Sequence, residues 1–426
     1  MATHSRSHSW RCRCPKVAAP LGSALLIAAC SLGSQATPTV TQLPPSNTIS
    51  LKLPAAPDET ELAPTDEPEP STSTTVTPTT TTVPGVYSHT GVGQMSPAVA
   101  NAKNYVYVPS NDDGSVTVID QETMQIVKRY NVGKLVQHIV PSWDLTTLYA
   151  TASDSNRLVE IDPTTGDKGA SIRVAAPYDL YFTPDGSTAI VIAERLNRID
   201  FYDRLTWKRR LAVDVPCKGV NHAEWSADGT WFLATCEVSG EVLKVDSGTG
   251  AILNVLPLPK GSMPQDLRLA PDGTKFYVAD MDCGCVWVVA ADGTATSGSI
   301  STGIGAHGIY PSRDASVMYV SNRGRTARDV RRKSKPGDGS VSVIDTKTDT
   351  VIATWVIPEG GSPDMGGVSA DGKRLWLSGR YDSAVYVFDT TTGQLIATIA
   401  VPRGPHGLAV FPQPGRYSLG DTGNYR

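Results

Sequence analysis

The chain contains 426 residues, carries a formal net charge of −4, and has only 19% charged residues. No broad basic surface is therefore expected, which argues against a protein that binds DNA or RNA. Glycine (38) and proline (31) are frequent and aromatic residues make up 7%, a balance that favours a long all-β domain and excludes a collagen-like or wholly disordered chain.

Residues 1–29 are typical of an export signal. A basic stretch with Arg11, Arg13 and Lys16 precedes an apolar run from Val17 to Ala29. This run is too short to cross a bilayer but has the length of the hydrophobic region of a signal peptide. We therefore expect the mature chain to be extracytoplasmic.

The segment Leu26–Cys30 resembles the lipobox of bacterial lipoproteins, in which the cysteine becomes the lipid-modified first residue of the mature protein. The resemblance implies that Cys30 anchors the chain to a membrane of the bacterial cell envelope. In the alternative, an ordinary signal peptide is cut after Ala29 and Cys30 has no such role. No later segment is apolar enough to span a bilayer, so the lipid would be the only membrane attachment.

Residues 30–86 are rich in proline, threonine and serine, most of all from Ser71 to Pro84. Such a composition cannot bury a hydrophobic core. We expect a disordered, extended linker that holds the folded part away from the membrane.

Residues 87–426 contain an internal repeat. One series of turn residues is spaced 41 to 57 residues apart: Asp144, Asp185, Asp228, Asp272, Asp314, Asp371 and Gln413. A second series follows β-branched runs: Asp120, Asp162, Asp203, Asp246, Ala290, Asp345 and Asp389. Each unit has the pattern of four short strands, and a period in the low forties with four strands is typical of a propeller blade. The sequence therefore predicts an all-β, seven-bladed β-propeller.

Four segments carry a family resemblance: Tyr105–Asn111, Val116–Asp120, Met318–Asn322 and Val341–Asp345. They resemble the YVTN repeat of bacterial seven-bladed β-propellers (YncE-like), and the match covers residues 105 to 413. The resemblance implies a seven-bladed ring. Members of this family and its structural relatives include surface proteins, lactonase-like enzymes, and domains that hold haem or copper over the central channel.

The two ends of the repeat are complementary. No inner-type strand precedes Tyr105, and the last inner strand, from Gly407 to Phe411, has no outer strands after it. We expect this C-terminal strand to pair with the N-terminal blade and close the ring, which removes exposed sheet edges. Deletion of residues 402–426 should therefore unfold the domain. Two flanking segments, Tyr87–Gly91 and Tyr417–Asp421, have no predicted role.

Every histidine within the repeats falls at the start of an inner strand, where aspartates occupy the same place in other repeats. Because inner strands surround the axis, we expect these side chains to converge at one end of the channel, here called the mouth side. The predicted ligand-binding residues there are His138, Asp179, His222, Asp266, His307, Asp364 and His406.

Two further interpretations of this ring remain open. Imidazole and carboxylate groups ligate zinc and copper, so His138, His222, His307 and His406 could hold a divalent transition metal. Alternatively, the polar side chains only line a hydrated channel.

Basic residues follow the second strands on the mouth side. Arg323 and Arg380 could clamp a carboxylate or phosphate, or they could pair with neighbouring acids on a solvated rim. A strongly basic insertion from Arg325 to Lys335 could contact an anionic partner or form a solvated loop.

The cysteines of the repeats are expected to meet an oxidising compartment. Cys217 precedes an inner strand and Cys236 ends the strand beside it, so a disulfide between them is predicted. Cys283 and Cys285 could form a local disulfide, contact a soft metal or remain free thiols.

Few catalytic motifs are present. Gly303–Gly308 matches a dinucleotide-binding pattern but joins two predicted strands, without the helix that would receive a pyrophosphate. The first hypothesis is therefore a monomeric, lipid-anchored scaffold that binds a small polar ligand, a glycan or an envelope protein. The second is a lactonase-like or metal-dependent enzyme with a histidine and aspartate site over the channel.

Overall fold

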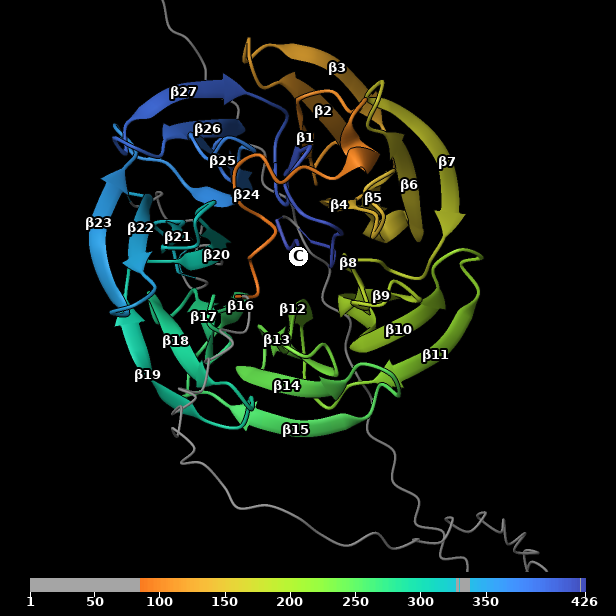
Figure 1. The fold of residues 1–426 in the computed structure, drawn as a ribbon, viewed down its shortest axis with the longest axis vertical. Coiled ribbons are helices and arrows are strands. Elements are labelled where there is room, and N and C mark those ends of the chain that lie inside the picture. The colour runs from red at the N-terminus through yellow and green to blue at the C-terminus, as the bar shows by residue number, and fades with distance from the viewer. Residues whose placement is uncertain (1–84, 327–328, 330–337, 422) are drawn as a thin grey trace, which may run out of the picture. The chain divides into compact units, whose positions relative to one another are not determined.

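The structure, a computed structural model, describes residues 85–326, 329, 338–421 and 423–426. Within these residues the strands form seven four-stranded sheets, which surround a central axis as blades (Figure 1). The predicted seven-bladed β-propeller is confirmed. The expected signal peptide, Cys30 and nearly all of the expected linker lie outside the described residues. No described helix has the length and apolarity that a membrane crossing requires.

The blades follow one another along the chain, and each is given from its inner to its outer strand. Blade 1 consists of β28 (Ala409–Phe411), β1 (Tyr105–Pro109), β2 (Ser115–Asp120) and β3 (Ile126–Asn131). Blade 2 consists of β4 (Val136–Pro141), β5 (Leu148–Ala152), β6 (Arg157–Asp162) and β7 (Asp167–Arg173). Blade 3 consists of β8 (Asp179–Phe182), β9 (Thr188–Ala193), β10 (Arg198–Asp203) and β11 (Arg209–Asp214). Blade 4 consists of β12 (Val220–Trp225), β13 (Trp231–Cys236), β14 (Glu241–Asp246) and β15 (Ile252–Pro257).

The remaining blades have the same order. Blade 5 consists of β16 (Pro264–Leu269), β17 (Lys275–Asp280), β18 (Cys285–Ala290) and β19 (Thr296–Ser301). Blade 6 consists of β20 (Ala306–Pro311), β21 (Val317–Asn322), β22 (Ser340–Asp345) and β23 (Thr350–Val356). Blade 7 consists of β24 (Pro363–Val368), β25 (Arg374–Gly379), β26 (Ala384–Asp389) and β27 (Leu395–Ala400). Short 3₁₀ helices occupy Pro97–Val99, Ser153–Ser155 and Glu194–Leu196.

Burial changes from the axis to the rim. The inner strands β4 and β12 are buried along their whole length, because both of their faces pack against neighbouring blades. The outer strand β27 alternates between partly buried and exposed positions, as expected for a strand with one solvated face. The core is therefore a set of apolar layers between adjacent blades.

The repeated aspartates act as turn anchors. In blade 3, Asp185 Oδ1 accepts hydrogen bonds from the Thr183 hydroxyl (2.6 Å) and the Ser187 amide (3.0 Å). At the next turn of the blade, Asp203 Oδ1 accepts from the Thr206 amide at 2.8 Å. These bonds hold the tight turns together on the side opposite the mouth, here called the turn side. The aspartates repeat in the sequence because each accepts the hydrogen bonds that hold a turn of its blade.

The ring closes as predicted. β28 pairs with β1 in antiparallel register, with Tyr105 opposite Phe411 and Tyr107 opposite Ala409. Gln121 Nε2 donates to the carbonyl oxygens of Tyr105 (3.1 Å) and Phe411 (2.9 Å), so one side chain ties both strands together. Blade 1 is therefore built from both ends of the repeat.

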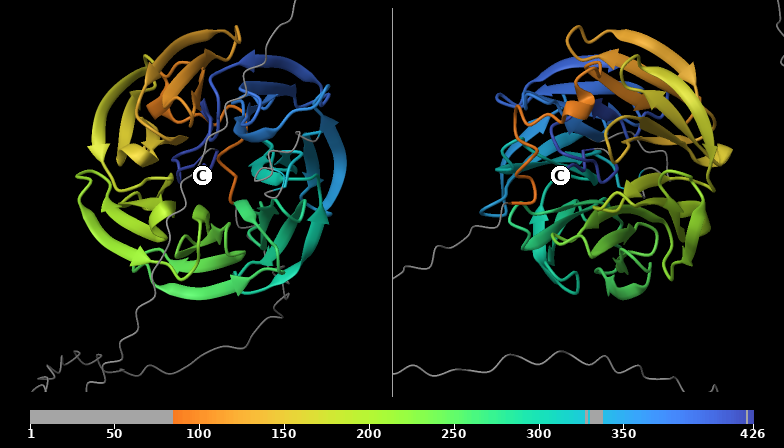
Figure 2. Two further views of the ribbon diagram at one scale, coloured as in Figure 1. Left: turned by 180° about the vertical axis from the view of Figure 1, so that it is seen from behind. Right: turned by 45° about the vertical axis from the view of Figure 1, so that its right-hand side comes forward.

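The segments that flank the repeat pack across the turn side of the channel. Before β1, the Tyr87 hydroxyl donates to the Leu269 carbonyl oxygen at 2.9 Å. After β28, the Leu419 carbonyl oxygen accepts from the Phe182 amide at 2.9 Å. The tail ends at the centre of the ring, as Figures 1 and 2 show. These two segments therefore close the end of the channel opposite the mouth.

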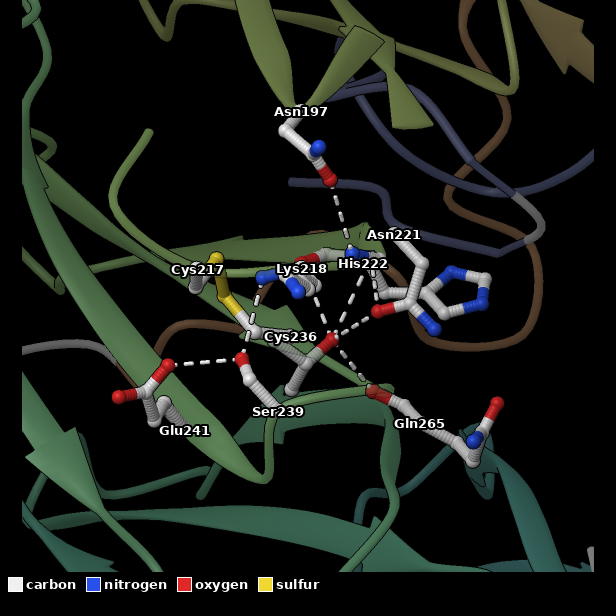
Figure 3. The surroundings of a disulfide bond; sticks show 11 residues. Asn197, Cys217, Lys218, Asn221, His222, Cys236, Ser239, Glu241 and Gln265 are labelled. Atoms are coloured by element: carbon white, nitrogen blue, oxygen red, sulfur yellow. Dashed lines mark hydrogen bonds between the residues drawn. A yellow bond between two sulfur atoms is a disulfide. The ribbon is translucent and has the colours of Figure 1, made fainter. Parts of the chain in front are cut away.

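Two disulfides are present in the described residues. The predicted bridge between Cys217 and Cys236 is formed and lies beside the inner strand that carries His222 (Figure 3). Cys283 and Cys285 are also bonded to each other, which decides between the three alternatives left open by the sequence.

Candidate functional site

The structure brings the four propeller histidines together on the axis. The ring centroid of His138 lies 4.9 Å from that of His406 and 5.4 Å from that of His222. The ring of His307 lies 6.0 Å from His222 and 5.7 Å from His406. All four residues are at most 1% exposed. The start of each inner strand thus contributes to one buried cluster of polar side chains.

These side chains form two layers because the aligned inner strands carry them at two successive positions. His138, His222 and Met365 occupy equivalent positions, because the backbone amide of each donates a hydrogen bond of 2.9–3.3 Å to a hydroxyl of the neighbouring strand. His307, Asp364 and His406 precede this position by one residue and form the mouth layer. The channel layer lies one residue deeper and contains His138, Asp179, His222 and Asp266.

Asp364 is the centre of the mouth layer. Its Oδ2 lies 2.7 Å from His406 Nδ1, and its Oδ1 lies 3.2 Å from His307 Nδ1. Arg323 Nε donates to Oδ1 at 2.7 Å. Burial alone would raise the pKa of Asp364, but the charges of Arg323 and Arg380 and the hydrogen bond from Arg323 hold it below its usual value. Asp364 is therefore an ionised carboxylate, and Arg323 forms a fixed ion pair with it.

The two histidines of the mouth layer are neutral at neutral pH. Burial lowers the pKa of His307 and of His406 well below the usual value, and the nearby arginines lower both further. His406 Nε2 lies 3.2 Å from the Tyr178 hydroxyl. Asp364, His406 and Tyr178 thus form a hydrogen-bonded chain that reaches the channel mouth.

A cavity of ≈ 250 Å³, here called the mouth pocket, opens above this layer. Glu194 and Glu237 line it from blades 3 and 4, and burial together with the charge of Glu237 raises the pKa of Glu194 to about 7. Arg380 lines it from blade 7, and its Nη1 is 3.8 Å from Asp364 Oδ2 and makes no hydrogen bond within the described residues. The other lining residues are Gln137, Tyr178, Met263, Met281, His307, Arg323, Tyr381 and His406.

The sequence did not predict that Asp421 of the C-terminal tail belongs to the channel layer. Its Oδ1 lies 3.2 Å from His138 Nδ1, and its Oδ2 lies 3.8 Å from His222 Nδ1. Asp179 faces the same two rings at 3.8 Å and 3.5 Å. Burial and the charge of Asp421 raise the pKa of Asp179 to about 7. The tail therefore supplies a carboxylate to a layer otherwise built from inner strands.

A buried arginine completes the channel layer. Arg268 Nη1 donates to Asp266 Oδ1 at 2.9 Å, and Arg268 Nη2 lies 3.6 Å from Asp421 Oδ2. Burial raises the pKa of Asp266 to about 6, although the charge of Arg268 opposes this shift. Two sets of donor atoms among the described residues lie within 4.8 Å of one another: His138, Asp179 and His222, and also His222, Asp266 and Asp421.

Most of the basic insertion predicted from Arg325 to Lys335 lies outside the described residues. Arg325 itself is 8% exposed, and its guanidinium lies 4.8 Å from the centre of the Tyr381 ring. The first residue of the insertion thus packs at the edge of the mouth pocket.

The model of one protein family, described as YNCE-like beta-propeller, matches residues 75–415. The chain belongs to this family. The match includes every inner strand and every histidine of the two layers. The tail residue Asp421 lies beyond it. No curated protein sequence matches the chain.

Solved structures with the same fold differ widely in what they are. A functionally unknown protein from Desulfotomaculum acetoxidans DSM 771 is 15% identical with a TM-score of 0.59, over 72% of this chain and 99% of that one. A candidate 6-phosphogluconolactonase from Bacteroides uniformis ATCC 8492 is 17% identical with a TM-score of 0.57, over 72% and 99%. The dihydro-heme d1 dehydrogenase NirN is 14% identical with a TM-score of 0.52, over 74% and 75%. At these identities the similarity shows the propeller fold alone.

Proposed function

We propose that the chain is an extracytoplasmic, lipid-anchored β-propeller that acts as a monomer and binds a small zwitterionic ligand in the mouth pocket. An α-amino acid or a short peptide has the required groups. Cys30 would carry the anchor. A glycan or a protein of the cell envelope is the alternative partner for this pocket.

The observation that carries this proposal is the distribution of charge across the pocket. In a ring of seven, blade 7 stands opposite blades 3 and 4. Arg380 therefore faces Glu194 and Glu237 across the mouth. A guanidinium suits a carboxylate of the ligand, and a pair of carboxylates suits an ammonium group.

The size of the pocket supports a small ligand. A volume of ≈ 250 Å³ falls below the ~300–1,000 Å³ of pockets that hold drug-sized molecules. Because the flanking segments close the turn side, a bound molecule would rest on His307 and His406 and contact solvent only at the mouth.

The test is a thermal shift assay on the full chain with a panel of defined probes. Free amino acids and dipeptides should raise the Tm. Succinate lacks an ammonium group, putrescine lacks a carboxylate and glucose lacks both, so each should raise the Tm less. Arg380→Gln and Glu194→Gln should each weaken the effect at least ~10-fold in ligand concentration, since each removes one charged hydrogen bond.

Arg403→Gln is the matched control, because the Arg403 side chain is 81% exposed and pairs only with Asp112 in the described residues. This variant should respond like the unmodified chain. A panel in which no zwitterion stabilises the protein, or in which glucose is as effective, would refute the proposal.

The chain of Asp364, His406 and Tyr178 favours one second candidate, a lactonase-like enzyme that uses His406 as a general base. Its low pKa makes His406 a weak base, so binding is the better-supported function. Hydrolysis of a panel of sugar lactones that is lost in His406→Gln would establish the enzyme instead.

A further inference from the structure

The channel layer lies below the mouth pocket and has no part in the proposed function. Four of its side chains lie close to one another: His138 from blade 2, Asp179 from blade 3, His222 from blade 4 and Asp421 from the C-terminal tail. All four are 0% exposed. Side chains from four separate parts of the chain thus form one buried cluster.

The spacing of their donor atoms suits a metal ion. Each imidazole Nδ1 lies near an oxygen of each aspartate, at 3.2 and 3.8 Å for His138 and at 3.5 and 3.8 Å for His222. Four ligands bound tetrahedrally at ~2.0–2.2 Å from zinc are ~3.3–3.6 Å from one another. The four His–Asp separations lie close to this range.

The hydrogen bonding of the two imidazoles is incomplete. Within the described residues, His138 Nε2, both ring nitrogens of His222 and Asp179 Oδ2 make no hydrogen bond. Buried polar atoms without partners are rare and costly, so a group that satisfies them is expected at this point. Neutral imidazole nitrogens and carboxylate oxygens together are a usual ligand set for zinc.

The composition of the layer is compatible with a bound cation. It holds the carboxyl groups of Asp179, Asp266 and Asp421 and the guanidinium of Arg268, all fully buried. A divalent cation between the carboxyl groups would offset the cost of burying them together.

We propose that the channel holds one divalent transition-metal ion, best suited to zinc, bound by His138, His222, Asp179 and Asp421. Four protein ligands leave no open coordination position, which is typical of a structural zinc site. The ion joins the C-terminal tail to blades 2, 3 and 4, so it holds the tail in the channel.

The first test is elemental analysis of the full chain, purified without a histidine tag. We expect about one equivalent of a transition metal, and less than about 0.1 equivalent in His222→Ala and in the nearly isosteric Asp421→Asn. His89→Ala is the matched control, because His89 lies outside the channel, and it should keep the metal. Circular dichroism establishes that each variant is folded.

The second test measures uptake by protein that has been unfolded, stripped with a chelator and refolded. Added zinc chloride should raise the Tm, and cobalt chloride should give the strong visible absorption of four-coordinate cobalt. Refolded protein that takes up neither ion refutes the site. Metal retained fully in folded Asp421→Asn refutes the role of the tail. Binding of zwitterions, with its dependence on Arg380, is a separate measurement, so the two proposals can fail independently.

Discussion

Deletion of residues 402–426 should unfold the propeller, because this segment supplies the inner strand of blade 1. Four of its apolar side chains, Leu408, Val410, Phe411 and Leu419, are 0–3% exposed. Burial of one such side chain contributes about 1.5–3 kcal/mol, so their removal costs about 6–12 kcal/mol. A folded domain is stable by only about 5–15 kcal/mol in total. The loss therefore matches the whole stability of the domain.

A second truncation separates ring closure from the packing of the tail. Deletion of residues 416–426 removes Leu419 and Asp421 but keeps β28 paired with β1. We expect this shorter deletion to melt cooperatively at a lower Tm, and the longer deletion to show no cooperative transition. Scanning calorimetry with far-ultraviolet circular dichroism measures both. A longer deletion that melts cooperatively within a few degrees of the full chain would refute the closure argument.

Three further predictions concern the site and its surroundings. The folded state raises the pKa of Glu194 from the usual 4.5 to about 7, so stability should fall by up to about 3 kcal/mol as the pH rises through this window. Urea titrations of Glu194→Gln should lack this decline, and an unchanged pH profile would contradict the shift. Replacement of Cys217 and Cys236 by serine opens a loop of 19 residues and should cost about 3 kcal/mol, seen as a Tm lower by several degrees. A reducing agent should then have little further effect on this transition. In Gly407→Ala the new Cβ would lie 2.2 Å from His138 Nδ1, which must move the ring. Elemental analysis of the folded variant should show at least ~10-fold weaker metal retention, and undiminished zinc would contradict the assigned ligands.

The fold could be predicted because its determinants repeat. Tight turns recur from blade to blade, and in each of the two turn series six of the seven positions keep the aspartate that anchors the turn. Ring closure could be predicted because the first repeat lacks an inner strand and the chain ends with an inner strand that has no outer strands after it. The predicted bridge between Cys217 and Cys236 followed from the neighbouring strands of one blade.

The candidate site was only partly predictable. The alignment of the inner strands located His138, His222, His307 and His406. It places these residues at two adjacent strand positions, and the two positions correspond to the two layers of the structure. Asp421 could not be found in this way, because it belongs to a tail outside the repeat whose position depends on tertiary contacts alone. The raised pKa of Glu194 likewise depends on burial and on the charge of Glu237 in another blade, both of which arise from tertiary structure.

Because the flanking segments pack across the turn side, the central channel opens at the mouth side and does not run through the ring. The segments that carry Tyr87 and Leu419 pack across one end of the channel, so a molecule in the mouth pocket enters and leaves from the mouth side. A larger partner bound over the mouth pocket would block dissociation of the ligand. The partner would then set the dissociation rate of the ligand, without any movement of the blades.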